Sequence, residues 1–319
     1  MALTRPEIGV YVDRRQESVV DVAPRTEEIC APPLSAADRV VQLVGGRQVG
    51  FRESGDPDGR PAFFFHGFGT SRVICPPDDQ ARRMGIRLIA VDRPGIGLSE
   101  PSPGRRLLDW PVDVGQLADR LDLEHFSVIG WSGGGPYALA CGYSLADRVT
   151  SVAAVSSPAP LAGNGEADYL RRMDKHAVRA AGRAPWVIRL AMWHWGRTQR
   201  RDAERFFEES VAEMCAFDQE VLAAPELRDR MIANSAEVYR QGGRGMYDEA
   251  LVLARPWGFH VGDIGVRVQV WHGGDDDTVP IAMGRYLARS IPSATATFDR
   301  RAGHQLVYRR WPEILAAVR

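Results

Sequence analysis

A serine within a glycine-rich segment is the feature of this sequence that points most directly to chemistry. Residues 130–134 (GWSGG) follow an apolar run at 126–129 and precede a run of small residues at 137–141. This order predicts a strand, a tight turn and a helix, and the glycines leave space where a Cβ would collide with neighbouring backbone. Ser132 would then stand at the edge of a sheet with its hydroxyl accessible, which is the position of a nucleophile.

A second glycine-rich segment is suited to stabilise the oxyanion that forms when a serine attacks a carbonyl group. Residues 66–69 (HGFG) follow a predicted strand. We expect the backbone N–H groups of Phe68 and Gly133 to form an oxyanion hole. His66 and Trp131, close to these donors in the sequence, are the predicted substrate-binding residues. Taken alone, the segment also fits an ordinary tight turn.

A serine hydroxyl needs a general base, and histidine serves most often. Of the seven histidines, His304 is the strongest candidate, because it follows a glycine just after the last predicted strand. It also comes after both the serine and the candidate acid in the chain, which is the order of an α/β arrangement. His125 opens the serine strand and is interpreted as a solvated or capping residue. A structural role is the interpretation for the histidines in or beside the central segment, His176, His194 and His260.

The acid that orients this histidine is expected in residues 271–280 (WHGGDDDTVP), where another predicted strand ends. A carboxylate there would hold the imidazole of His304 in the correct tautomer and stabilise its charged form. Three consecutive aspartates cannot all reach one histidine, so two must be solvated or cap the next helix. Asp276 is favoured, and Asp277 and Asp275 stay open as alternatives.

A charged loop, residues 92–99 (DRPGIGLS), follows the strand predicted at 88–91. The spacing favours a structural turn, in which Asp92 bonds backbone amides and Gly95 and Gly97 take unusual dihedral angles. We therefore interpret the loop as structural rather than catalytic.

Short apolar strands alternate with helices on both sides of a long central segment. A glycine turn between the alternating runs 40–44 and 48–53 predicts a β-hairpin. The alternation that follows predicts a mostly parallel sheet flanked by helices on both faces. Strands are predicted at 62–65, 88–91, 126–129, 149–155, 266–271 and 294–298. Helices are predicted at 79–84, 112–121, 136–145, 281–290 and from Pro312 onward.

The central segment has no strand pattern, and its aromatic residues and methionines are scattered among charged residues. We predict that residues 38–157 and 262–319 form the α/β core, and that residues 158–261 form a helical cap inserted over the carboxyl edge of the sheet. Residues 1–37, with four prolines and weak periodicity, are predicted to be an N-terminal arm. The arm or the cap offers a surface for a homodimer.

The composition excludes several classes of partner. The 40 lysine and arginine residues are interspersed among 41 aspartate and glutamate residues, for a formal net charge of −1. Neither nucleic acid nor a charged membrane surface is therefore an expected partner. The four cysteines have no C-x-x-C pair and no metal-ligand spacing with histidine. Neither a metal nor an organic cofactor is expected. The lack of a signal-like or membrane-spanning apolar stretch favours a cytoplasmic protein. The expected partner is a small-molecule substrate.

Together these segments resemble the α/β-hydrolase superfamily, in its capped branch of esterases and related enzymes. The resemblance rests on residues 66–69, 92–99, 130–134 and 303–304 and on Asp276, in the order that the superfamily uses. It implies an α/β-hydrolase fold with a helical cap. It also implies a serine hydrolase that cleaves an ester, thioester or lactone of a small, largely apolar molecule through an acyl-enzyme.

Departures from the superfamily narrow this expectation. Epoxide hydrolases and haloalkane dehalogenases of this branch place an aspartate at the nucleophile, so Ser132 argues against both. C–C bond hydrolases tend to carry a longer oxyanion loop. The intact Ser132, Asp276 and His304 set favours hydrolysis. A C–C bond hydrolase, a lyase or a cyclase with the same triad, and a non-catalytic small-molecule-binding protein, are the alternatives.

Overall fold

An eight-stranded sheet forms the centre of the computed structural model, which describes residues 34–161 and 180–319. Its strands are β1 (Asp38–Gln42), β2 (Gln48–Gly55), β3 (Arg60–Phe65), β4 (Ile86–Val91), β5 (Phe126–Trp131), β6 (Val149–Val155), β7 (Arg267–Gly273) and β8 (Ala294–Asp299). They lie in the order β1-β2-β4-β3-β5-β6-β7-β8. The hairpin β1–β2 and the pair β2–β4 are antiparallel, and every other neighbouring pair is parallel. The predicted hairpin and mostly parallel sheet are confirmed.

The central strands are continuous apolar runs because helices cover both faces of the sheet. Every residue of β5 is buried. Phe63 of β3 packs edge to face against Phe126 of β5, with ring centroids 4.9 Å apart. Two separate groups of buried residues, one on each face, fix the strands whose ends carry the candidate site.

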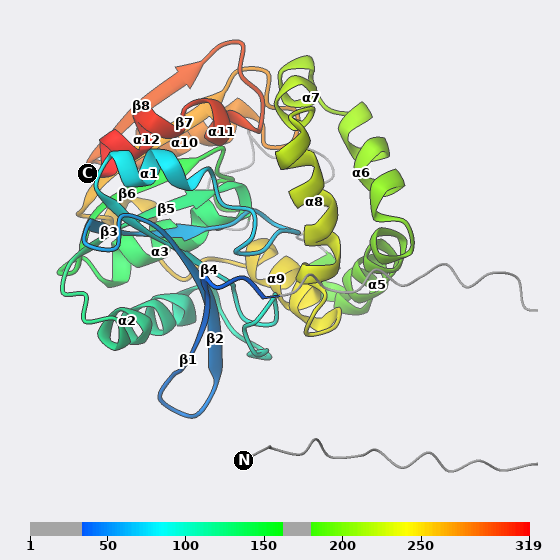
Figure 1. The fold of residues 1–319 in the computed structure, drawn as a ribbon, viewed down its shortest axis with the longest axis horizontal. Helices are drawn as coiled ribbons and strands as arrows, with labels where there is room; N and C mark the ends of the chain where they lie inside the picture. The colour runs from blue at the N-terminus through cyan, green and yellow to red at the C-terminus, as the bar shows by residue number, and fades with distance from the viewer. Residues whose placement is uncertain (1–33, 162–179) are drawn as a thin grey trace, which may run out of the picture.

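Helices of the core pack on the two faces (Figure 1). They are α1 (Asp78–Arg83), α2 (Trp110–Arg120), α3 (Gly135–Ser144), α10 (Ile281–Ser290), α11 (Leu306–Arg309) and α12 (Trp311–Val318). Buried residues of α2, α3 and α10 belong to one face, and those of α1, α11 and α12 to the other. Prolines in the first turn of α2, α3 and α12 help to define where these helices begin, because a missing N–H costs nothing there. The short helix α11 was not predicted.

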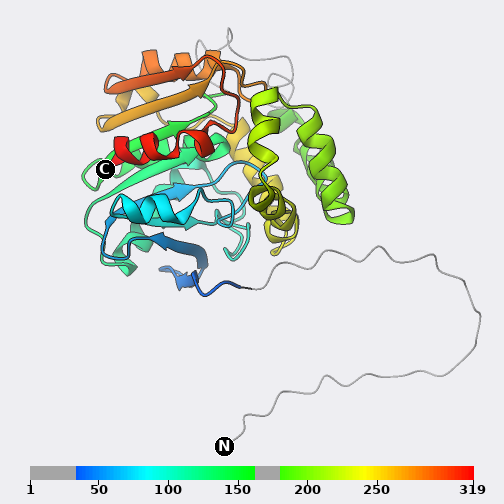
Figure 2. The ribbon, with the colours of Figure 1, turned by 45° about the horizontal axis from the view of Figure 1, so that its top comes forward.

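A second group of helices lies between β6 and β7 in the chain and is called the cap below. It comprises α5 (Pro185–Arg201), α6 (Ala203–Ala212), α7 (Ala216–Leu222), α8 (Pro225–Val238) and α9 (Arg244–Ala254). Figure 2 shows these helices side by side at one edge of the sheet. Residues that directly follow β3 and β5 line a cavity together with residues of α5, α6 and α8. The cap therefore covers the carboxyl ends of the strands.

Some predictions lie outside the described residues. They concern residues 1–33 of the predicted N-terminal arm and residues 162–179 of the predicted cap, which include His176. Of the helices that the structure describes, none combines the length and the apolar character that crossing a membrane requires.

Candidate active site

Ser132 stands in the turn between β5 and α3 with a backbone conformation that L-residues rarely adopt. Its φ is +52°, a strain of about 1–3 kcal/mol that the surrounding structure must hold in place. Gly130 and Gly134 make the turn possible, because a Cβ on Gly130 would collide with the carbonyl of Gly134, and one on Gly134 with that of Phe65. Pro136 lies in the first turn of α3. The strand–turn–helix expected around Ser132 is present.

His304 is held at all four of its polar atoms. Its Nε2 lies 2.8 Å from Oγ of Ser132, and its Nδ1 lies 2.9 Å and 3.1 Å from the two carboxylate oxygens of Asp276. Its backbone N–H donates to Asp218 over 2.8 Å, and its carbonyl accepts from the indole N–H of Trp131 over 3.2 Å. A neutral imidazole that donates from Nδ1 to Asp276 accepts the serine hydroxyl at Nε2. The structure thus brings the three predicted catalytic side chains together.

The turn after β7 selects Asp276 from the three consecutive aspartates. One carboxylate oxygen of Asp276 accepts from the backbone N–H groups of Thr278 over 3.0 Å and Val279 over 2.7 Å. These bonds hold the carboxylate against the imidazole. Asp275 and Asp277 are exposed, so neither takes this place.

A second buried histidine adjoins the same carboxylate, and the sequence did not single it out. Nε2 of His272 lies 2.8 Å from the carbonyl oxygen of Val279 and 3.5 Å from Oδ2 of Asp276. Burial lowers the pKa of His272 below its ordinary value of 6.5, against the attraction of Asp276. The ring is therefore neutral at pH 7, and an Nε2–H donor to Val279 stabilises the turn that presents the carboxylate.

The pKa of His304 is raised above its ordinary value of 6.5. Burial alone would lower it, because burial disfavours the charged imidazolium. The charge and hydrogen bond of Asp276, with further attraction from Asp218 and Asp277, outweigh burial. The site therefore favours a proton on His304, which suits the predicted role of this residue as a general base.

The loop after β3, residues 66–69, places the N–H of Phe68 beside the serine turn; it is called the oxyanion loop below after its predicted role. A Cβ on Gly133 would lie 2.8 Å from the backbone nitrogen of Phe68, so the two predicted oxyanion donors are close together. The carbonyl of the same peptide, that of Gly67, accepts from Nη2 of Arg93 and from Oγ1 of Thr70, each over 2.9 Å. Because the peptide is trans, the N–H of Phe68 points away from these partners. No acceptor among the described residues bonds this N–H, which leaves it available to an oxyanion.

His66 does not lie where a substrate-binding residue must lie, and this prediction is corrected. The side chain is fully buried behind the oxyanion loop and is not among the residues that line the cavity. Its Nδ1 lies 2.9 Å from the carbonyl oxygen of Gly67, and the N–H of Arg93 points to its Nε2 over 3.4 Å. Burial, with the nearby charge of Arg93, holds the pKa of His66 well below its usual range. The neutral ring therefore supports the loop from behind.

The loop after β4 is structural, as predicted. Asp92 is fully buried and accepts from the backbone N–H groups of Arg72 over 2.7 Å and Leu98 over 2.9 Å. Gly95 and Gly97 have φ values of +83° and +52°. These dihedral angles suit glycine because it lacks a Cβ.

Buried ion pairs also join this part of the core to the cap, which the sequence did not predict. Arg93 donates to two carbonyls of the oxyanion loop and pairs with Glu249 of α9, with Nε 2.8 Å from the carboxylate. Arg72 pairs with Asp92 over 2.7 Å and with Glu237 of α8. The cap therefore helps to fix the guanidinium of Arg93, which bonds the carbonyls of His66 and Gly67 in the loop after β3, and that of Arg72, which bonds Asp92 in the loop after β4.

Glu249→Gln is expected to lower the free energy of unfolding by about 3 kcal/mol, because removal of one partner leaves the buried guanidinium of Arg93 without its counter-charge. Urea denaturation of the variant and the parent protein measures the change. The matched control is Glu204→Gln, which breaks an exposed ion pair with Arg228 within the cap. The control should show no measurable change, and an equal loss in both variants would contradict the prediction.

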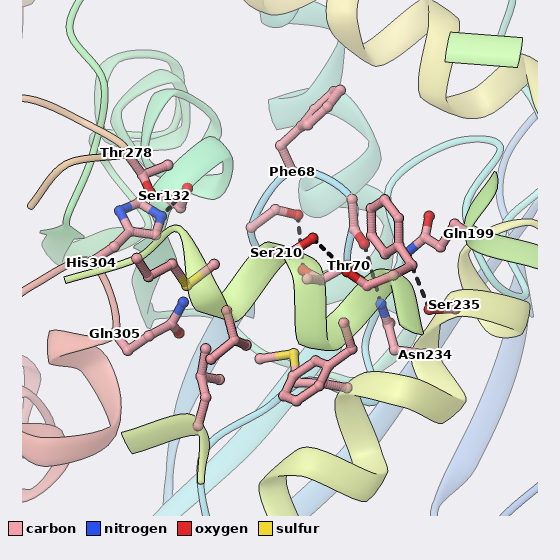
Figure 3. Close-up of a pocket in the computed structure, with 18 of the residues that line it drawn as sticks. Phe68, Thr70, Ser132, Gln199, Ser210, Asn234, Ser235, Thr278, His304 and Gln305 are labelled. Carbon is pink, nitrogen blue, oxygen red and sulfur yellow. Dashed lines mark hydrogen bonds between the residues drawn. The ribbon is translucent and has the colours of Figure 1, made fainter. Parts of the chain in front are cut away.

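A cavity of about 390 Å³ lies between the predicted catalytic residues and the cap (Figure 3). The aromatic and methionine side chains that the cap contributes to its wall are Trp195, Phe206, Phe207, Met214 and Met231. Trp195 stacks on Phe68, with ring centroids 5.6 Å apart. Trp131, the other predicted substrate-binding residue, lines the cavity. No aspartate, glutamate, lysine or arginine is among the described residues of the wall, so its charge is set by His304.

A known protein family matches most of the chain. The family model for the alpha/beta hydrolase fold matches residues 61–308. The match runs from β3 to α11. The chain belongs to the alpha/beta hydrolase family. The predicted fold class is thereby confirmed.

Relatives of this alpha/beta hydrolase include esterases and proteins named as peroxidases. The chain is 34% identical over 124 residues to a non-heme chloroperoxidase of Streptomyces lividans, a match that covers 36% of this chain and 43% of that protein. It is 35% identical over 80 residues to a pimeloyl-[acyl-carrier protein] methyl ester esterase of Legionella pneumophila, a match that covers 25% of this chain and 30% of that protein. The chain thus matches less than half the length of these curated relatives.

A solved structure shows the same fold over nearly the whole molecule. An esterase from Exiguobacterium antarcticum superposes with a TM-score of 0.65 over 88% of this chain and 97% of that one, at 18% sequence identity. Among the residues that the structure describes, this alpha/beta hydrolase has no group of three or more histidine, cysteine, aspartate and glutamate side chains that could hold a metal ion.

Proposed function

We propose that this alpha/beta hydrolase is a serine hydrolase that cleaves an ester, thioester or lactone of a small, largely apolar molecule through an acyl-enzyme. The observation that carries the proposal is the linear arrangement of Ser132, His304 and Asp276, with 2.8 Å between Oγ and Nε2 and 2.9 Å between Nδ1 and the carboxylate. Each group lies within hydrogen-bond reach of the next, as nucleophilic catalysis by serine requires.

The proposed reaction has two halves with the same proton carrier. Oγ of Ser132 attacks the carbonyl carbon while Nε2 of His304 takes its proton, and the N–H groups of Phe68 and Gly133 bind the oxyanion. Collapse of this intermediate expels the alcohol or thiol, which receives the proton from Nε2. Water then attacks the acyl-enzyme by the same route and releases the acid and the serine. Asp276 stabilises the imidazolium in both halves.

The cavity wall supports a neutral, largely apolar substrate. Its described side chains include several aromatic rings and methionines and no ionised carboxylate, ammonium or guanidinium group. A charged acyl group would lose its hydration there with no ion-pair partner other than His304, which costs several kcal/mol. Relatives named as esterases, one curated and one a solved structure, give independent support to ester chemistry.

Turnover of p-nitrophenyl esters of short and medium acyl chains, combined with labelling by a fluorophosphonate probe, tests the proposal. We expect release of p-nitrophenol and stoichiometric labelling at Ser132, identified by mass spectrometry of the labelled peptide. Protein denatured before exposure is the control for non-specific labelling. Tight ligand binding without turnover or labelling would instead indicate a binding protein, and would overturn the proposal.

We expect kcat/KM to fall on the acidic side of its pH profile, and we expect the midpoint of this acidic limb to lie above pH 6.5. Only neutral imidazole accepts the serine proton, and the pKa of His304 is raised above that value. Below the raised pKa, His304 is protonated and kcat/KM falls as pH falls. The profile is measured with an uncharged ester so that substrate ionisation does not contribute. A limb centred below pH 6.5 would contradict the assignment of His304 as the base.

A further inference from the structure

A carboxylate of the cap reaches the main chain of the catalytic histidine. Asp218, in α7, is fully buried. One of its oxygens accepts from the backbone N–H of His304 over 2.8 Å, and the other accepts from the backbone N–H of Gln305 over 2.7 Å. These consecutive N–H groups lie just before α11 and have no helical carbonyl to bond, so the carboxylate supplies both missing acceptors.

The loop is shaped to receive this carboxylate. A Cβ on Gly303 would collide with Oδ1 of Asp218 and with Sγ of Cys215. Glycine at this position thus allows the cap to pack directly on the loop backbone. The carbonyl of His304 is fixed separately by the indole of Trp131. The main chain that carries the imidazole is therefore held on its N–H side by the cap and on its carbonyl side by the core.

We propose that Asp218 is a positioning residue through which the cap fixes the catalytic histidine and adds a second negative charge beside it. The inference rests on the proposed function for its link to catalysis, while the geometry concerns His304 itself. In this arrangement Asp276 orients the ring from the core, and Asp218 orients the backbone from the cap. A catalytic site assembled in this way is complete only when the cap is docked.

The charged groups around the imidazole determine how the pKa of His304 changes when Asp218 is lost. The groups that face His304 are Asp276, Asp277 and His272 from β7 and the turn that follows it, Ser132 from the serine turn, and Asp218 from α7. Burial raises the pKa of Asp218 above its ordinary value of 3.8, while the N–H groups of Gln305 and His304 favour its charged form. Removal of this charge makes the imidazolium less stable, so the pKa of His304 falls.

Asp218→Asn tests the proposal, because the amide keeps one acceptor oxygen but turns a donor toward the second N–H. We expect kcat/KM on the pH plateau to fall by about tenfold to a hundredfold, as for a small misplacement of a catalytic group. We also expect the acidic limb to move by about half a pH unit or more to lower pH. Asp218→Glu, which keeps the charge but displaces it, should lower the plateau and leave the limb nearer to that of the parent protein.

Glu220→Gln is the matched control, since it removes the same charge from the same helix at an exposed ion pair with Arg309. It should reproduce the parent protein in both plateau and limb. Thermal denaturation shows whether each variant is folded at the assay temperature. If Asp218→Asn changes only the midpoint of denaturation, or matches the parent protein in plateau and limb, the proposal is wrong.

NMR titration separates this inference from the proposed function. The imidazole of His304, followed in protein labelled with ¹⁵N-histidine, reports its pKa in the free protein without any turnover. A lower pKa in Asp218→Asn together with no ester hydrolysis by the parent protein would retain the role of Asp218 and overturn the proposed function. Ester hydrolysis by the parent protein, together with an unchanged imidazole pKa and an unchanged plateau in Asp218→Asn, would retain the proposed function and overturn the role of Asp218.

Discussion

Ser132→Ala is expected to lower kcat for ester hydrolysis by on the order of 10⁵-fold, because no other group can form the acyl-enzyme. Oγ of Ser132 is the atom that Nε2 of His304 contacts over 2.8 Å. The residual rate comes from the oxyanion donors and from substrate binding, which alanine leaves in place. The measurement is kcat for a p-nitrophenyl ester, with fluorophosphonate labelling lost in the same variant.

The fold should survive this substitution, since alanine has the same Cβ as serine at the strained backbone position of residue 132. Ser127→Ala is the matched control, because Ser127 is buried in β5, the strand that leads to Ser132. Among the described residues its hydroxyl has one partner, the carbonyl of Pro61 over 3.5 Å. It should retain activity within a few-fold of the parent protein. Turnover by Ser132→Ala at more than a few per cent of the parental rate would show that another residue is the nucleophile.

The position of Ser132 could be predicted because its requirements are local. Steric exclusion at Gly130 and Gly134 and the proline in the first turn of α3 are encoded within seven residues of sequence. The parallel sheet was similarly accessible, since strands buried on both faces are continuous apolar runs. The glycine before His304 was also noted in the sequence. The sequence did not predict that this glycine leaves space for Asp218 and Cys215 of the cap.

The supporting residues could not be predicted because their partners are distant in the chain. Arg93 and Glu249 are 156 positions apart, and Asp218 and His304 are 86 apart. Nothing in the local pattern of either partner specifies the other. His66 shows the same limit in a local segment, since its place beside the oxyanion loop does not reveal on which side of the loop the ring is buried.

The sequence left three consecutive aspartates open as the acid, and the backbone of the turn decides which of them contacts the imidazole of His304. Only Asp276 can accept from the N–H groups of Thr278 and Val279 and still face the imidazole. Strand ends tell which loop carries the acid, but the side-chain direction depends on dihedral angles within the turn. A pattern of residue types does not specify those angles.

Asp276→Asn is expected to lower kcat by about 10⁴-fold at neutral pH. The asparagine carbonyl would keep the two N–H bonds of the turn, so its NH₂ group would face Nδ1 of His304. An NH₂ donor stabilises the tautomer in which Nδ1 is the acceptor and the proton is on Nε2. That tautomer cannot take the proton of Ser132. The loss is therefore expected with little change in KM, because the cavity wall is unaltered.

Asp275→Asn and Asp277→Asn are the matched controls, since both remove one carboxylate from the same turn at exposed positions. Each should retain kcat within a few-fold of the parent protein. Asp277→Asn should also move the acidic limb slightly to lower pH, because Asp277 contributes to the raised pKa of His304. A loss of 10³-fold or more in either control, with Asp276→Asn active, would assign the acid to that neighbour. Equal and small losses in all three variants would mean that the imidazole needs no carboxylate at Nδ1, and that the contacts of Asp218 and Trp131 with the backbone of His304 are enough to orient it.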